Sequence, residues 1–154
     1  MFNLTTNDVT NLFVLLGILL GVYIVLRLFV FPTINKLASK TSTYLDDLFL
    51  DKKFLNRFSY VIVFVVFNFL QSAEQFNLSF FESEIFTRLL DALFSLAVGL
   101  TVLELLTVLN KLSETIDSLK NKPIKGYVQI VKIIVTSFIA IIIFAIITEI
   151  GRAH

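Results

Sequence analysis

Four long apolar stretches divide this chain, and charged residues gather between them. A helix needs about 20 mostly apolar residues to cross the hydrocarbon core of a bilayer. The stretches therefore predict four membrane-spanning helices, at residues of about 9–31, 54–73, 89–109 and 126–148. The β-branched run 141–147 would suit a buried strand in water, but a lone strand in lipid leaves its backbone polar groups unpaired. The predicted fold class is an all-α membrane protein with four transmembrane helices.

Lysine and arginine are unevenly distributed over the segments that join these spans. Residues 27–57 carry six of them and residues 111–132 carry five, whereas the opposite side has only Arg88 and Arg152. The side richer in Lys and Arg normally faces the cytoplasm. We therefore expect the N-terminus, the C-terminal end and the loop 74–88 outside, and the two basic linkers in the cytoplasm.

The first basic linker has apolar residues at helical spacing. They are Ile34, Leu37, Tyr44, Leu45 and Leu48, and the charged residues Lys36, Lys40, Asp46 and Asp47 lie largely between them. This pattern predicts an amphipathic cytoplasmic helix after Pro32. Two positions suit such a helix equally well, one on the inner leaflet and one packed against the neighbouring spans.

The composition agrees with a membrane protein and excludes several other classes. Hydrophobic residues make up 56% of the chain and charged residues only 16%, with a mean hydropathy of +0.87; a soluble domain has about a quarter charged residues. The net charge of +1 gives no reason to expect a nucleic-acid partner. The chain has no Cys and its single His is His154, which excludes a thiol nucleophile and a His-based triad or metal cluster. We expect membrane lipids as partners. We do not expect enzymatic activity, a cofactor or a metal ion.

Two charged residues lie well inside the predicted spans, where they cost free energy and are candidates for function. Glu104 is seven residues before Lys111, and Lys132 is seven residues after Lys125. At 1.5 Å per residue, both lie about 10 Å above the same predicted cytoplasmic surface. The positions predict an ion pair between Glu104 and Lys132 across the third and fourth spans. The alternative is that each side chain reaches the headgroup region separately.

The segment that enters the fourth span resembles a known family. Residues 119–134 read Leu-Lys-Asn-Lys-Pro-Ile-Lys-Gly-Tyr-Val-Gln-Ile-Val-Lys-Ile-Ile, and the core of this segment is Pro123, Ile124, Lys125 and Gly126. It is similar to the stretch entering a membrane helix in the miniconductance (YbdG-like) branch of the small-conductance mechanosensitive channel superfamily, MscS. The acidic pair in 45–48 and the basic boundary in 54–58 resemble the same branch. The resemblance covers nearly the whole chain in order.

The resemblance implies a stretch-gated ion channel that protects bacteria from osmotic stress in the inner membrane. Members of this branch have an outside N-terminus, five spans and a homoheptameric pore lined by the fifth span, followed by cytoplasmic domains. This sequence departs from the family's pattern in that the pore helix and the cytoplasmic β domain are absent from it, since residue 154 falls where the pore helix would start. The four spans here would be the peripheral, lipid-facing sensor of a longer subunit. The corner at 123–126 would then couple the third and fourth spans to the pore, unless it is an ordinary helix–helix turn.

Two other classes of function remain open. A self-contained four-helix accessory or assembly protein needs no pore, and the apolar centres of three spans suit it. A transporter needs polar groups at mid-depth, and a membrane hydrolase needs a nucleophile with a base. Ser95 lies four residues after Asp91, but no second base joins them. Asp91 is instead predicted to pair with Arg88, three residues earlier on the same helix.

Overall fold

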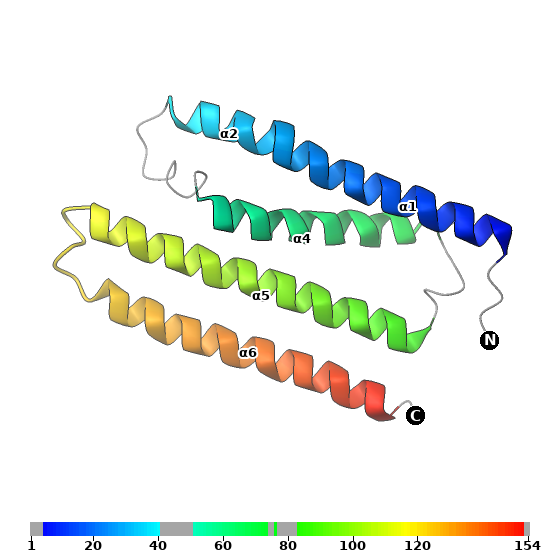
Figure 1. Ribbon diagram of the computed structural model, residues 1–154. Coiled ribbons are helices and arrows are strands. Elements are labelled where there is room, and N and C mark those ends of the chain that lie inside the picture. The colour runs from blue at the N-terminus through cyan, green and yellow to red at the C-terminus, as the bar shows by residue number, and fades with distance from the viewer. Residues whose placement is uncertain (1–4, 41–50, 74–75, 77–82, 153–154) are drawn as a thin grey trace.

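The computed structural model describes residues 5–40, 51–73, 76 and 83–152. Within these residues the chain is helical and has no strand. The elements are α1 (Thr6–Val25), the π-helix η1 (Leu26–Val30), α2 (Phe31–Ala38), α4 (Lys52–Gln71), α5 (Glu84–Thr115) and α6 (Ile124–Arg152). Figure 1 shows them as long helices lying side by side.

In the described part of the chain, four helical segments are long and apolar enough to cross a membrane, which confirms the predicted fold class. They are Thr6–Ala38, Lys52–Gln71, Glu84–Thr115 and Ile124–Glu149. Most extend beyond the predicted spans at one or both ends, because a helix continues past the hydrocarbon core into the headgroup region. The 32 residues of α5 make a helix about 48 Å long, against a hydrocarbon core of about 30 Å. The orientation across the bilayer stays a prediction.

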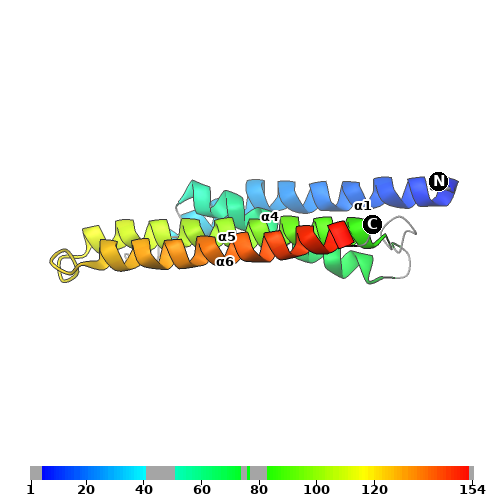
Figure 2. The same ribbon diagram turned by 90° about the horizontal axis from the view of Figure 1, so that it is seen from below.

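The helices form an open row. Among the described elements, α1 packs on α4, α4 on α5 and α5 on α6. Figure 1 shows α1 at one edge of the row and α6 at the other, and Figure 2 shows the row edge-on as a narrow band. The start of α1 and the end of α6 lie at the same end of the row, as an even number of antiparallel spans requires. The end of α2 and the α5–α6 turn lie at the opposite end (Figure 1).

Helix starts are set by local capping. Thr5 and Asp8 form a capping box, in which the Thr5 hydroxyl accepts from the Asp8 N–H and the Asp8 carboxylate accepts from the Thr5 N–H. At the start of α4, one carboxylate oxygen of Asp51 accepts from the N–H groups of Lys53 and Phe54 at 2.9 and 3.0 Å. These contacts satisfy N–H groups that have no partner within the helix.

Pro32 lies inside a continuous helix instead of starting a separate one. A proline ring within a regular α-helix clashes with the carbonyl four residues earlier and removes one hydrogen bond. The five residues before Phe31 widen into the π-helix η1, in which the Phe31 N–H donates to the Leu26 carbonyl. A local π-helix is a known way for a helix to absorb such a disruption. The segments α1, η1 and α2 therefore run as one span of 33 residues.

The predicted amphipathic linker is described only over α2. Ile34 is half-buried there, whereas Leu37 is exposed. The other apolar positions of the pattern, Tyr44, Leu45 and Leu48, lie outside the described residues, as do Asp46 and Asp47.

Burial differs sharply between the centre and the edge of the row. The central helix α5 buries Thr101, Glu104, Val108 and Leu112, which are spaced three or four residues apart. In α6, no residue with a described side chain is buried, and its half-buried positions form one stripe: Ile124, Val128, Lys132, Val135, Ile139, Ile143 and Ile146. Lipid is as apolar as these side chains, so the exposed faces of α6 carry no hydrophobic penalty in a membrane.

Close contact between α5 and α6 depends on one glycine. Gly99 is buried, and a Cβ atom placed on it would lie 2.5 Å from Cγ1 of Ile139. A side chain at this position would force Ile139 to shift, so the absence of one at Gly99 allows Ile139 to pack against the α5 backbone as it does here. Small residues serve the same purpose at many membrane helix contacts.

Candidate functional site

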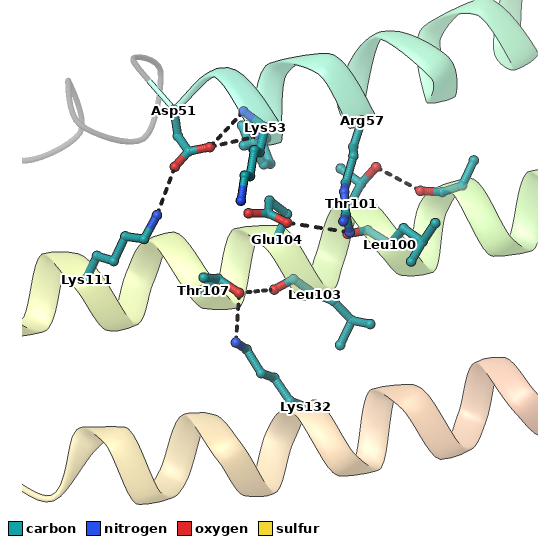
Figure 3. A network of polar contacts seen from close by, with 12 residues as sticks. Asp51, Lys53, Arg57, Leu100, Thr101, Leu103, Glu104, Thr107, Lys111 and Lys132 are labelled. Carbon is teal, nitrogen blue, oxygen red and sulfur yellow. Dashed lines mark hydrogen bonds and ion pairs between the residues drawn. The ribbon is translucent and has the colours of Figure 1, made fainter.

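An ion pair inside the spans joins α4 to α5. Nη1 of Arg57 lies 3.5 Å from Oε2 of Glu104, and the same nitrogen donates to the Leu100 carbonyl at 3.0 Å (Figure 3). The Glu104 side chain is only 10% exposed, whereas that of Arg57 is 36% exposed. A buried charge without a partner is costly in a protein interior and in a membrane. Arg57 therefore makes the carboxylate of Glu104 tolerable within its span.

The predicted ion pair between Glu104 and Lys132 is not formed. Nζ of Lys132 donates instead to the Thr107 hydroxyl at 2.7 Å, and that hydroxyl donates to the Leu103 carbonyl at 2.9 Å (Figure 3). Thr107 follows Glu104 by three residues and so points about 60° away around the helix axis. This rotation lets Glu104 face Arg57 on α4 while Thr107 faces Lys132 on α6. Glu104 and Lys132 lie at a similar depth, but depth did not identify their partners. The direction in which a side chain of α5 points around the helix axis decides whether it meets α4 or α6.

A second ion pair joins α4 and α5 at the end of the row that holds the α5–α6 turn. Oδ2 of Asp51 lies 3.4 Å from Nζ of Lys111, while Oδ1 caps α4 (Figure 3). Partial burial by itself raises the pKa of Asp51. The hydrogen bond from the Phe54 N–H, the contact with Lys111 and the Lys53 N–H outweigh it, so the net pKa lies below the ordinary 3.8. Asp51 therefore stays ionised in both of its roles at neutral pH.

At the opposite end of the row, Arg88 joins α5 to α6. Its guanidinium pairs with Glu84 at 2.9 Å, one turn earlier on α5, and with Glu149 on α6. The predicted pair with Asp91 does not form, because Asp91 points to an exposed face of α5. As with Glu104, the direction in which the Arg88 side chain points around the helix axis decides which neighbouring helix supplies its partner.

The helices α5 and α6 are thus joined at three levels along their length. Arg88 and Glu149 meet at one end, Gly99 and Ile139 in the middle, and Thr107 and Lys132 toward the other end. These contacts hold the two helices as one hairpin, and the Arg57–Glu104 pair connects the hairpin to α4. Such an arrangement positions helices relative to one another. Over residues 5–40, 51–73, 76 and 83–152, no group of three His, Cys, Asp or Glu side chains could hold a metal ion.

The candidate coupling corner is the start of α6. Pro123 immediately precedes the helix, and its carbonyl accepts from the Tyr127 N–H at 3.4 Å. Ile124 and Lys125 line a cavity of about 240 Å³ between the end of α5 and the start of α6. A Cβ atom on Gly126 would meet nothing within 4 Å, so Gly126 does not serve close packing here. The corner is a loosely packed helix start, and its role in coupling stays a prediction.

Arg57 is the missed partner for which the sequence held a usable signal. The sequence treats it as part of a basic boundary, but α4 begins at Lys52 and Arg57 already lies more than one turn inside the helix. The predicted second span, 54–73, already included Arg57, so the sequence placed a positive charge inside a span, as it did for Glu104. Two opposite charges within neighbouring spans are natural partners.

Comparison with known proteins gives no further assignment. No protein-family model matches the chain, and no curated protein and no solved structure matches it.

Proposed function

We propose that these helices form the peripheral, tension-responsive part of a subunit of a mechanosensitive ion channel. The family would be the small-conductance (MscS) superfamily, in its miniconductance branch, acting in the bacterial inner membrane during osmotic stress. The segment 119–134, which resembles the entry to a membrane helix in that branch, supports the family. The observation that carries the mechanism is the open row of helices, with α6 exposed on every face but one.

An open row suits a sensor of membrane tension because it offers lipid a large surface. A stimulus shifts an equilibrium only when it interacts differently with the two states. Large apolar side chains point outward along both edge helices, among them Phe13 and Phe29 on one edge and Phe138 and Phe144 on the other. A change in helix tilt in a stretched, thinner bilayer alters the lipid contacts of these faces. Tension would then favour the state with the larger in-plane area.

The α5–α6 hairpin provides the connection from sensor to pore. Because its two helices are joined at three levels, they would move as one unit. In the resembling branch, a pore-lining helix follows the fourth span. Motion of the hairpin would reach such a helix through the end of α6 and the corner at 123–126. The full-length subunit would act as a homo-oligomer, a heptamer by analogy with the branch.

The first experiment reads the native reading frame beyond the codon for His154. A following Gly- and Ala-rich helix with a polar, β-rich region would support the channel. An immediate stop codon would overturn it and favour a four-helix accessory or assembly protein.

The second experiment records currents from the full-length protein in liposome patches under suction. We expect openings that begin at a defined tension and that are absent from liposomes without the protein. The variant Pro123→Ala should shift this tension threshold, because it alters the start of α6. An unchanged threshold would remove the corner from the mechanism while leaving the channel itself in place.

A further inference from the structure

A basic cavity lies where α2 meets the start of α4. Its volume is about 310 Å³. Two cationic side chains, Arg27 and Lys52, and two amides, Asn35 and Asn56, form its polar lining. Its apolar lining consists of Pro32 and the buried residues Phe31 and Leu55. By the predicted orientation, this cavity opens at the cytoplasmic end of the spans.

The polar groups of this cavity have capacity to bind a ligand. Among the residues that the structure describes, neither Arg27 nor Lys52 forms an ion pair with a carboxylate. Arg27 donates one hydrogen bond, to the Tyr23 hydroxyl at 2.8 Å, and its guanidinium has further donors. The side-chain oxygen of Asn35 is buried and has no partner within the described part of the chain. The cavity thus offers two positive charges and an unused acceptor.

An apolar groove lies along the contact between α1 and α4, about one helical turn from this cavity. It begins at Tyr23 and Tyr60, whose rings stack with centroids 6.0 Å apart. A space of about 590 Å³ extends from these rings along Leu16, Leu20 and Val63. A further apolar cavity of about 420 Å³ shares Leu16 and Val63 with this space, so the groove extends deeper between the helices.

The dimensions match one leaflet of a bilayer. Arg27 and Leu16 are eleven residues apart on one continuous helix, which is about 16 Å at 1.5 Å per residue. Half of the hydrocarbon core is about 15 Å. Tyrosine rings at the junction of the polar and apolar parts are typical of the membrane interface. From the cavity to the groove, the lining changes from charged to aromatic to apolar, which matches a phospholipid from its headgroup to its acyl chain.

We propose that the α1–α4 contact binds one anionic phospholipid of the cytoplasmic leaflet. Its phosphate lies between Arg27 and Lys52, and one acyl chain follows Tyr23, Tyr60 and Val63 toward Leu16. The positive charges select an anionic headgroup, and the Asn35 oxygen accepts from a headgroup hydroxyl such as that of phosphatidylglycerol. The apolar groove selects a lipid over a free phosphate ion. This site depends on the membrane embedding and not on the channel function, so either proposal can fail without the other.

The test measures lipid affinity by native mass spectrometry of the purified chain in detergent. The probes are dioleoylphosphatidylglycerol, dioleoylphosphatidylcholine and inorganic phosphate. We expect phosphatidylglycerol to bind more tightly than phosphatidylcholine. Arg27→Gln and Lys52→Gln should each weaken phosphatidylglycerol binding about fivefold, as expected for the loss of one cationic contact with an anionic headgroup. Phosphatidylcholine carries the same phosphate but no net charge, so its affinity should fall less than that of phosphatidylglycerol in both variants, and its remaining binding reports that the groove is intact.

Matched controls separate a defined site from general attraction. Lys53→Gln removes the same charge from the neighbouring position, which does not line the cavity, and should leave phosphatidylglycerol binding unchanged. Val63→Phe fills the groove and should weaken both lipids, whereas Val65→Phe, at an exposed position on the same helix, should weaken neither. Equal losses in the three charge variants would overturn the proposal, as would displacement of the lipid by inorganic phosphate at equal concentration.

Discussion

Replacing Arg57 by Gln should destabilise the helix row more than replacing Glu104 by Gln, although the two residues form one ion pair. Arg57→Gln leaves a carboxylate that is 10% exposed, and a lone charge within a span costs about 2.5–3.5 kcal/mol on insertion scales. Glu104→Gln leaves a guanidinium that is 36% exposed and keeps its bond to the Leu100 carbonyl. Its long side chain can reach water or headgroups, so we expect a cost of about 1 kcal/mol.

The double variant should cost less than the sum of the two single variants, because it leaves no lone charge. We expect a coupling free energy of about 2 kcal/mol, within the range found for residues in direct contact. The chain has no Cys and Ser59 is 1% exposed, so Ser59→Cys places one protected thiol in α4 as a common background. The rate of thiol labelling in mixed micelles then reports the free energy of opening for each variant.

A second cycle, with Glu104→Gln and Lys132→Gln, provides the control. Lys132 bonds to Thr107 and not to Glu104, so these two changes should add to within about 0.5 kcal/mol. Stronger coupling in this second cycle than in the first would refute the assignment of Arg57 as the partner of Glu104.

Two further predictions concern single positions. Gly99→Ala should destabilise the α5–α6 contact by about 1–3 kcal/mol, because the new methyl group overlaps Ile139, whereas Gly126→Ala should be tolerated; a thermal-unfolding comparison in which both variants match the parent would contradict this packing. Asp51→Ala should cost about 1 kcal/mol through the lost cap, and Asp51→Asn less, since an amide still caps the helix. Because the folded pKa of Asp51 is lowered, its carboxylate stabilises the fold above pH 3.8 and this contribution is lost as the pH falls through the folded pKa. Unfolding followed from pH 7 to pH 2 should therefore show a smaller acid-induced loss in Asp51→Asn than in the parent.

The positions of the spans were predictable, whereas the partners of the charges were not. Apolar length is a local property, and the helices form wherever the chain supplies about 20 apolar residues. Depth is also local, which is why Lys132 and the neighbourhood of Glu104 were correctly placed on facing parts of α5 and α6. The partner of a charge depends on direction around the helix, and a shift of three residues from Glu104 to Thr107 turns the side chain from one neighbour to the other.

By itself, the sequence determined an all-α membrane protein whose described residues include four helices long and apolar enough to cross a bilayer. Hydrophobic length and the scarcity of charge decide these features, because lipid excludes unpaired backbone and charge wherever they occur. Only the tertiary structure decided that the helices form an open row, that Arg57 pairs with Glu104 and that Gly99 admits Ile139. A span such as α6 is apolar on every side, so its sequence carries no amphipathic signal to mark the packed face. In lipid that face is selected by shape and by a few polar contacts, and these exist only once the neighbouring helices are in place.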